Sequence, residues 1–117
     1  VFPPSGGTID ALGANAACTV YPGSVLVFTS NNGLAWKLSG TRVAAATLAA
    51  GAATVSDTNI RATSSANVQR LAVLGTIVSV HLLPTITAVT NVVVQSQDIT
   101  GTNDATDVST INVTINY

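Results

Sequence analysis

The chain carries very little charge. Of its 117 residues, four are Lys or Arg and five are acidic, and every acid is Asp because the sequence contains no Glu. A nucleic-acid-binding surface needs clustered cations to neutralise phosphates, and a surface for anionic lipids needs the same clustering. The four cations are scattered along the chain, at Lys37, Arg42, Arg61 and Arg70. We therefore expect neither nucleic acid nor an anionic membrane surface among the partners.

Cysteine and histidine occur once each, at Cys18 and His81. A tetrahedral zinc site built from these residue types needs several of them, so one chain cannot supply it. A Cys–His pair is formally possible, but His81 lies in the apolar segment Val80-His-Leu82, which is typical of a hydrogen-bonded core or edge residue. No serine lies in a nucleophile-elbow motif, so a Ser–His–Asp triad is not indicated. We expect no enzyme and no cofactor, with Cys18 either a small buried hydrophobe or a bridge between chains.

The sequence also lacks Met and any long apolar run. Its most apolar stretch, residues 71–83, is shorter than the roughly 20 residues that a membrane-spanning helix needs. We therefore expect no membrane span. The absence of Met, together with a first residue Val1, is consistent with a processed N-terminus and an extracellular or cell-surface location.

What is present is apolar and neutral. Hydrophobic residues make up 47% of the chain, and low charge with high hydrophobicity favours collapse into a folded domain. The surface must then consist mainly of Thr, Ser, Asn, Gln and Ala, which repel one another poorly. Such a surface suits a subunit packed against its own copies, although a monomer with a neutral polar surface is the alternative.

The first half of the chain contains a clear β-hairpin. Residues 24–30 are rich in β-branched and aromatic side chains, Asn31–Gly33 is a strong hairpin turn, and residues 34–39 return as the partner strand with Trp36 on its apolar face. A short strand over 18–21 precedes it and ends at the turn Pro22-Gly23. The Ala-rich segment 42–55 favours either a short helix or an irregular strand.

The second half reads as further strands. Residues 59–63 predict a weak strand, residues 68–83 a central strand buried on both faces and ended by Pro84, and residues 85–97 another strand. Gly75 is a candidate bulge or bend. A loop over 98–107 leads into the last strand, in which four side chains alternate onto one apolar face: Ile111, Val113, Ile115 and Tyr117.

The fold prediction is an all-β single domain over residues 8–117, a β-sandwich or jelly roll of about seven to eight strands. It is preceded by an extended arm over residues 1–7, because Pro3 and Pro4 fix the backbone and Phe2 gives the arm something to bury. The arm and the apolar face of the last strand are the candidate subunit contacts.

Two weaker signals remain. The loop residues Asp98, Asn103, Asp104 and Asp107 could supply several of the six to eight oxygens that Ca²⁺ takes. Their spacing does not match an EF-hand and the same residue types form ordinary turns, so we expect a solvated loop and no metal site. Asn112-Val-Thr114 is a glycosylation sequon on the polar face of the last strand.

Two stretches resemble a known family. Cys18-Thr-Val-Tyr-Pro-Gly-Ser-Val-Leu-Val-Phe28 and the closing Val113-Thr-Ile-Asn-Tyr117 are similar to the early and terminal strands of spore-coat-U-type, archaic chaperone–usher pilins. The resemblance implies an incomplete immunoglobulin-like sandwich that a neighbour's N-terminal strand completes. The chain lacks a second cysteine to pair with Cys18, and a donor strand would have to extend through Thr8 to Leu12.

The sequence therefore favours a structural subunit of an extracellular filament or pilus, a homopolymer formed by β-strand addition. A viral coat or capsid-decoration protein with a jelly roll explains the neutral surface equally well. A carbohydrate-binding or adhesin module is a further alternative, for which Trp36 is the aromatic to test.

Overall fold

The protein is all-β. The computed structural model describes residues 1–10, 12–78 and 81–117, and these form eight strands in two sheets and no helix. This confirms the predicted fold class. The strands are β1 (Thr8–Ile9), β2 (Ser24–Ser30), β3 (Ala35–Thr47), β4 (Ala52–Ser56), β5 (Ser65–Ala72), β6 (His81–Thr87), β7 (Asn91–Gln97) and β8 (Thr110–Asn116).

The β2–β3 hairpin forms where the sequence predicts it. Ser24 pairs with Arg42 and Ser30 with Trp36 in an antiparallel register. The side-chain oxygen of Asn32 accepts two hydrogen bonds, from the Leu34 N–H at 3.0 Å and from the Ala35 N–H at 2.9 Å. Gly33 takes a φ of 75°, which glycine adopts at no steric cost. The turn chemistry of Asn-Gly thus fixes the register.

The Ala-rich segment 42–55 contains no helix. Arg42–Thr47 continues β3, and Ala52–Ser56 forms β4. The reason is tertiary: β3 pairs with β8 from Thr41–Asn116 to Thr47–Thr110, and its Ala44 side chain is buried against that sheet. Pairing and burial outweigh the helix propensity of alanine.

The two sheets pack as a sandwich around one main core. One sheet has the order β1-β3-β8-β5, with β2 also paired to β3, and the other has the order β4-β7-β6. The alternation predicted for the last strand is confirmed, because Ile111, Val113 and Ile115 are fully buried in the central strand β8. Val92 and Val94 of β7 face them in the same core. Each such side chain contributes about 1.5–3 kcal/mol on burial.

Several strand predictions in the second half are wrong. Residues 59–63 form no strand, although Ile60 is fully buried. The apolar segment 68–83 is not one buried strand: β5 ends at Ala72, Leu71 and Val73 are exposed, and β6 begins at His81. Ser79 and Val80 of that segment lie outside the described residues.

Pro84 lies within β6 and does not end a strand. Within the described residues β6 pairs only with β7, and an edge strand tolerates a residue without an N–H. The predicted strand over 85–97 is divided by a turn at residues 88–90 into the end of β6 and all of β7. The predicted loop over 98–107 is free of named strands, with one isolated bridge between Gln97 and Asn103.

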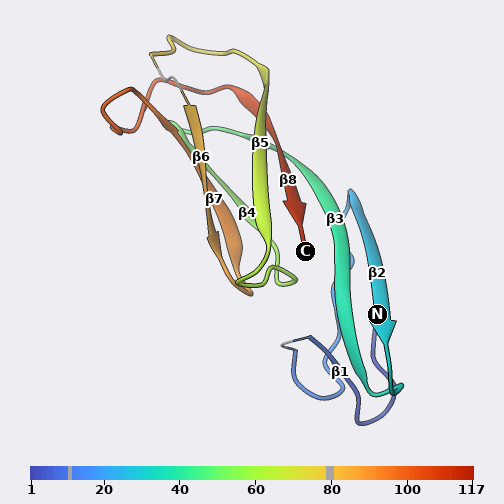
Figure 1. The fold of residues 1–117 in the computed structure, drawn as a ribbon. Coiled ribbons are helices and arrows are strands. Elements are labelled where there is room, and N and C mark those ends of the chain that lie inside the picture. Colours follow the sequence, from blue (N-terminus) through green and yellow to red (C-terminus); the bar gives the residue numbers. More distant parts are fainter. Residues whose placement is uncertain (11, 79–80) are drawn as a thin grey trace.

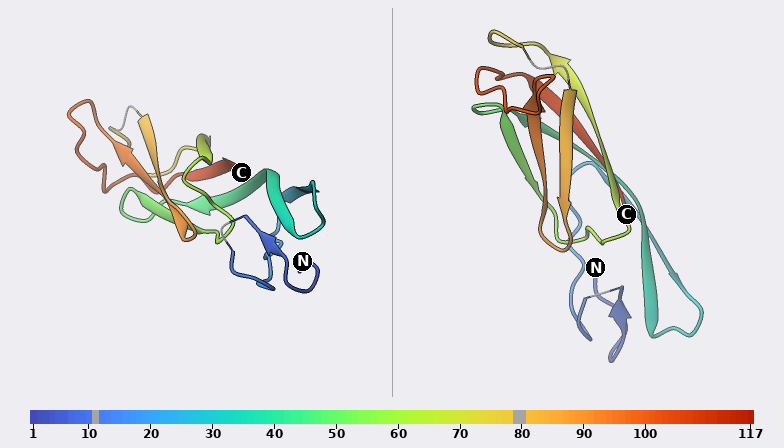
Figure 2. Two further views of the ribbon diagram at one scale, coloured as in Figure 1. Left: turned by 60° about the horizontal axis from the view of Figure 1, so that its bottom comes forward. Right: turned by 60° about the vertical axis from the view of Figure 1, so that its left-hand side comes forward.

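The molecule is elongated, with extents of 53 × 23 × 17 Å. The elongation arises from β3, which has 13 residues and is longer than β8 with its 7 residues. The β2–β3 hairpin therefore projects beyond the second sheet (Figure 1). Figure 2 shows the two layers of the sandwich and the hairpin extending past them. We call the projecting part, residues 1–10 and 12–40, the hairpin lobe.

Residues 1–7 do not form the extended arm that the prolines predict. Gly7 donates its N–H to the Pro4 carbonyl at 2.7 Å, so the segment turns back. Val1 and Cys18 exchange two backbone hydrogen bonds, of 2.8 and 2.7 Å. The predicted strand over residues 18–21 does not form, and β1 pairs in parallel with Ala35–Trp36. The N-terminal segment covers the inner face of the hairpin.

Candidate functional site

The hairpin lobe has a small core of its own. Ile9, Cys18 and Leu38 are buried in it, away from the main core. The Cys18 thiol donates to the Asn59 side-chain oxygen at 3.1 Å, and burial raises the pKa of that thiol. The structure thus places Cys18 as a small buried residue, and a bridge between chains would require the lobe to open.

An apolar groove lies on the surface of this lobe. Its volume is about 430 Å³, and Phe2, Phe28 and Trp36 bring three of the five aromatic rings of the chain to it. The Trp36 indole donates to the Gly33 carbonyl at 3.2 Å, which fixes the ring beside the turn. Phe2 is 72% exposed. The remaining lining residues are Val1, Pro3, Pro4 and Ile9. We call this hollow the apolar groove.

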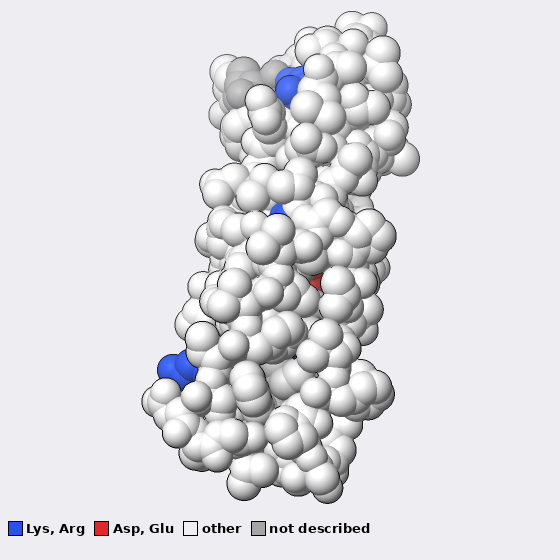
Figure 3. Space-filling model, turned by 90° about the vertical axis from the view of Figure 1, so that its right-hand side faces the viewer, with Lys and Arg blue, Asp and Glu red and all other residues white. Residues whose placement is uncertain are grey.

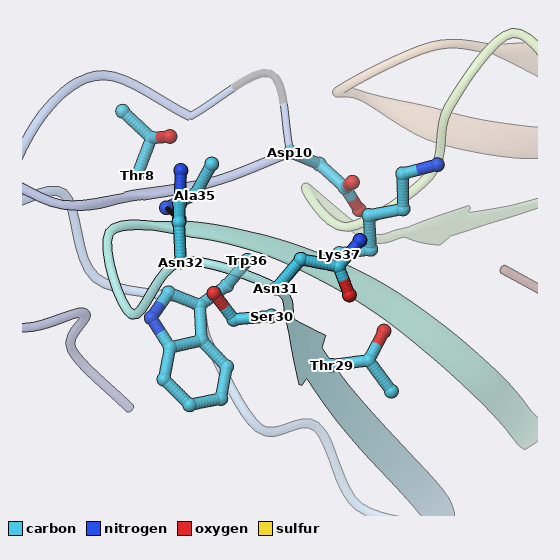
Figure 4. A pocket seen from close by; sticks show the side chains of 9 residues that line it. All are labelled: Thr8, Asp10, Thr29, Ser30, Asn31, Asn32, Ala35, Trp36 and Lys37. Atoms are coloured by element: carbon cyan, nitrogen blue, oxygen red, sulfur yellow. Dashed lines mark hydrogen bonds between the residues drawn. The ribbon is translucent and has the colours of Figure 1, made fainter.

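A polar hollow of about 520 Å³ adjoins it. Asp10 and Lys37 lie beside one another on one side of this hollow, with the Trp36 ring set apart from them (Figure 4). The Asp10 carboxylate accepts a hydrogen bond from the Leu38 N–H at 2.9 Å and lies 3.9 Å from the Arg61 guanidinium. The other residues that line the polar hollow are Thr8, Thr29, Ser30, Asn31, Asn32 and Ala35. Trp36 therefore separates an apolar surface from a polar one.

Buried polar contacts tie the lobe to the sandwich. Asp57 is fully buried; it accepts from the Arg42 guanidinium at 2.9 Å and from the Tyr117 hydroxyl. The same guanidinium lies 4.3 Å from the centre of the Tyr21 ring, a cation–π contact. Burial and the Asp57 carboxylate raise the pKa of Tyr117. Because a buried charge is tolerated only when it is paired, this cluster holds the two parts in one orientation.

The strand edges differ in how well they are protected. Within the described residues β2, β4, β5 and β6 each pair on one side only. Proteins protect such edges with short strands, prolines, charges or bulges. β4 has 5 residues, β6 contains Pro84, and β5 carries Arg70 and a register shift beside it. β2 has 7 residues, Ser-Val-Leu-Val-Phe-Thr-Ser, with none of these devices.

The register shows which backbone groups of β2 face outward. Val43 donates its N–H to the Gly23 carbonyl at 3.0 Å, so this pair is hydrogen-bonded. Bonded and non-bonded pairs alternate along an antiparallel ladder. Leu26, opposite Gly40, and Phe28, opposite Leu38, are therefore non-bonded to β3 and direct their N–H and C=O groups to the free edge. The edge of β2 is a template for a further strand.

The predicted subunit contacts divide into two groups. Phe2, Pro3 and Pro4 line the apolar groove, where another molecule can reach them. Ile111, Val113 and Ile115 do not form a contact surface, because they are fully buried inside this chain's own sandwich, and Tyr117 packs against both cores. The alternating pattern identified a buried face correctly, but it could not say whether the same chain or a neighbour covers it.

The four residues of the calcium hypothesis do not converge. Asp98 accepts hydrogen bonds within its own turn, from the Thr100 and Thr102 N–H groups at 2.8 and 3.0 Å. The Asn103 amide donates to the Ala50 carbonyl at 2.9 Å. Asp104 accepts from the Val78 N–H at 2.9 Å, and Asp107 pairs with Arg70. Among the described residues, no group of three or more His, Cys, Asp or Glu side chains is placed to hold a metal ion.

The other candidates are dispersed. His81 is exposed at the start of β6 and lies 3.2 Å from the Gln97 side-chain oxygen, whereas Cys18 is buried in the hairpin lobe. Asn112 lies on the outer face of β8, opposite Ala45 and Gln69 of the neighbouring strands. No helix of the described residues is long and apolar enough to cross a membrane.

The surface has the neutral character that the composition predicts. Figure 3 shows one long face of the molecule with only a few separated charged atoms. Comparison with protein-family models, with curated proteins and with solved structures finds no match to this chain. Its function is therefore inferred from the geometry of the groove and of the strand edges.

Proposed function

We propose that this protein is the structural subunit of an extracellular filament, a homopolymer assembled by β-strand addition at the free edge of β2. One observation carries the proposal: β2 is a full-length edge strand without proline, charge or bulge. An unprotected edge of this kind recruits a strand from another chain, because each unpaired N–H and C=O gains a partner.

The outer face of β2 supports the same function. Val25 is 67% exposed and Val27 is exposed two residues on, so an added strand would find apolar side chains as well as backbone groups. The neutral surface adds little electrostatic repulsion between copies. An extended partner added head to tail gives an open polymer when the rotation between copies does not close a ring.

The test is a charge on the free edge. Val27→Lys places an ammonium on β2, and we expect it to abolish filaments seen by electron microscopy at a concentration where the unmodified protein forms them. Val43→Lys is the matched control, because Val43 is an exposed valine on β3, which has partners on both sides. Filaments that survive Val27→Lys, or closed shells in place of filaments, would contradict the proposal.

Amide hydrogen exchange gives a second readout. The N–H groups of Leu26 and Phe28 should exchange quickly in the monomer and slowly in the assembly. Those of Val25 and Val27 face β3 and should be protected in both states. Unchanged exchange at Leu26 and Phe28 on assembly would exclude this edge as the acceptor.

A further inference from the structure

The sheet that carries β2 has a second free edge, at β5 on its other side. Within the described residues β5 pairs only with β8, and Figure 1 shows β5 and β2 on opposite sides of β8 and β3. The register shift of β5 lies at its end, between Arg70 and Ala72, and the Arg70 guanidinium pairs with the buried Asp107. The preceding residues, 65–69, therefore form an edge without charge, proline or bulge.

The directions of these two edge strands suit each other. The pairings of β2 with β3, of β3 with β8 and of β8 with β5 are all antiparallel, so β5 runs opposite to β2 within one molecule. A second copy in the same orientation, placed beside β2, would therefore offer its β5 in the antiparallel direction. Antiparallel pairs form the slightly more stable ladder. Repetition of this contact would join the sheets of successive copies into one continuous sheet.

The register shows which backbone groups of β5 face outward. Tyr117 donates its N–H to the Gly40 carbonyl at 3.0 Å, so the odd-numbered residues of β8 are hydrogen-bonded to β3. The even-numbered residues of β8 are then bonded to β5, where they stand opposite odd-numbered residues. Ala66 and Val68 are therefore not bonded to β8, and they direct their N–H and C=O groups to the free edge.

The outward-facing residues of both edges lie on the same face of the sheet. Leu26 and Phe28 direct their backbone groups outward from β2 and pack against the core of the hairpin lobe. Ala66 and Val68 pack against the main core. All four stand opposite even-numbered residues of β3, directly or through β8, and opposite residues of a ladder share a face. Joining the two edges therefore aligns apolar face with apolar face.

We propose that β5 of one copy is the strand that adds to the free edge of β2 in the next, with Val68 opposite Leu26. This contact rests on the proposed filament and names its partner strand. Two residues on, Ala66 lies opposite Phe28, so that a small side chain stands beside a large ring. Each of these pairs exchanges two backbone hydrogen bonds across the contact.

Disulfide trapping tests both the strand and its register. On the outer face Asn67 lies opposite Val27 in a non-bonded pair, in which the Cα atoms are about 4.5 Å apart and within reach of a disulfide. Single variants Val27→Cys and Asn67→Cys, carrying tags of different size, are mixed under assembly conditions and oxidised. Both positions are exposed, whereas Cys18 is buried and should not compete. We expect the mixed dimer to be the main product on a non-reducing gel.

Gln69→Cys is the matched control for Asn67→Cys. Gln69 is exposed on the same face of β5. In the proposed register it lies diagonally from Val27, about 7–8 Å away, which is too far for a disulfide without backbone movement. It should give little mixed dimer. A main product from Gln69→Cys, or a main product that joins two copies of Val27→Cys, would overturn the proposed pairing.

Charge exchange tests the contact in the filament itself. Asn67→Lys should raise the critical concentration for assembly more than about tenfold, because it places an ammonium on the joining edge. Val27→Lys combined with Asn67→Asp should restore filaments, to within about tenfold of the parent's critical concentration, because opposite charges then face each other across the ladder. Thr47→Asp is the control partner for Val27→Lys: it adds the same charge at an exposed position of β3 and should not restore them.

Amide hydrogen exchange identifies the partner strand without substitution. The N–H groups of Ala66 and Val68 should exchange quickly in the monomer and slowly in the filament, whereas that of Asn67 should be protected in both. Filaments that protect Leu26 and Phe28 but leave Ala66 and Val68 in fast exchange would overturn β5 as the partner and leave strand addition at β2 intact. No filaments from the unmodified chain would overturn both.

Discussion

Val89 is held in a backbone conformation that valine disfavours. Its φ is 59°, in the left-handed region, and its side chain is 45% exposed in the β6–β7 turn. The conformation is fixed by the Val89 N–H, which donates to the Ile60 carbonyl at 2.8 Å. A β-branched residue is strained here, whereas asparagine enters this region more readily.

Val89→Asn should therefore stabilise the protein by about 1 kcal/mol, since the strain is relieved and little burial is lost. Urea denaturation followed by circular dichroism measures the change. Val43→Asn serves as the comparison, because Val43 is equally exposed but lies in a strand, where asparagine is disfavoured. A Val89→Asn variant no more stable than the parent would show that the turn is not strained.

Asp107 links stability to pH. It is fully buried, and burial alone would raise the pKa of its carboxyl, but hydrogen bonds from Ser109 and Ser96 and the charge of Arg70 lower the pKa below its usual 3.8. A lowered pKa contributes stability that is present above the unfolded-state value and is lost as the pH falls through the folded-state value.

We expect the free energy of unfolding to be flat at neutral pH and to fall below about pH 4. Asp107→Asn should cost about 3 kcal/mol at pH 7, because it leaves Arg70 without its buried partner, and should reduce the acid dependence. Urea titrations at pH 7 and pH 3 measure both. Equal losses on acidification in the variant and the parent would assign the acid sensitivity to other groups.

At the residue scale, local pattern predicted burial but not pairing. The alternation in the last strand identified Ile111, Val113 and Ile115 as buried. The ion pairs of Arg42 with Asp57 and of Arg70 with Asp107 join residues 15 and 37 positions apart. Which charges meet depends on how the strands are ordered, and no local signal in the sequence carries that information.

At the element scale, prediction succeeded where turn chemistry was strong. The Asn-Gly turn placed β2 and the start of β3 correctly. The segment 42–55 was ambiguous because alanine favours helix locally, and only the pairing of β3 with β8 decides for strand.

The failure over residues 68–83 is the informative one. Apolar residues on both faces were taken to indicate a buried central strand, yet Leu71, Val73 and Leu74 are exposed. Their hydrophobicity is not needed for this chain's own core. Apolar side chains gathered at one exposed end are typical of a surface that another molecule covers. The wrong prediction therefore marks exposed apolar residues at the end of β5 and directly after it.

The residues of the apolar groove also show what the sequence could and could not predict. The sequence singled out Phe2, Pro3 and Pro4 as a contact segment, and they line the apolar groove. The sequence placed Trp36 on the apolar face of its strand. The structure packs the half-buried indole against the core of the hairpin lobe, where it also borders the apolar groove and the polar hollow. Alternation could not distinguish these cases, because the second sheet ends before it reaches the hairpin lobe.

At the scale of the whole molecule, shape and charge act together. The chain is more than twice as long as it is wide, at 53 Å against 23 Å, and its association surfaces are of two kinds. The apolar groove lies on the hairpin lobe, and the free edge of β2 runs along the same lobe. A strand added to this edge is a contact between two different surfaces, and such contacts give an open filament when the rotation from copy to copy does not close a ring.

The salt dependence of assembly should distinguish a filament held by apolar contacts and backbone hydrogen bonds from one held by charged contacts. Because backbone hydrogen bonds and the apolar side chains of β2 dominate the proposed contact and β2 carries no charge, the assembled fraction should change by less than about twofold between 0.05 and 0.5 M NaCl. Ammonium sulfate should increase it, since sulfate is excluded from the protein surface and strengthens apolar burial. Sedimentation of assembled from free protein measures both effects. Filaments that dissolve steeply in NaCl would instead require charged contacts that this nearly uncharged surface does not provide.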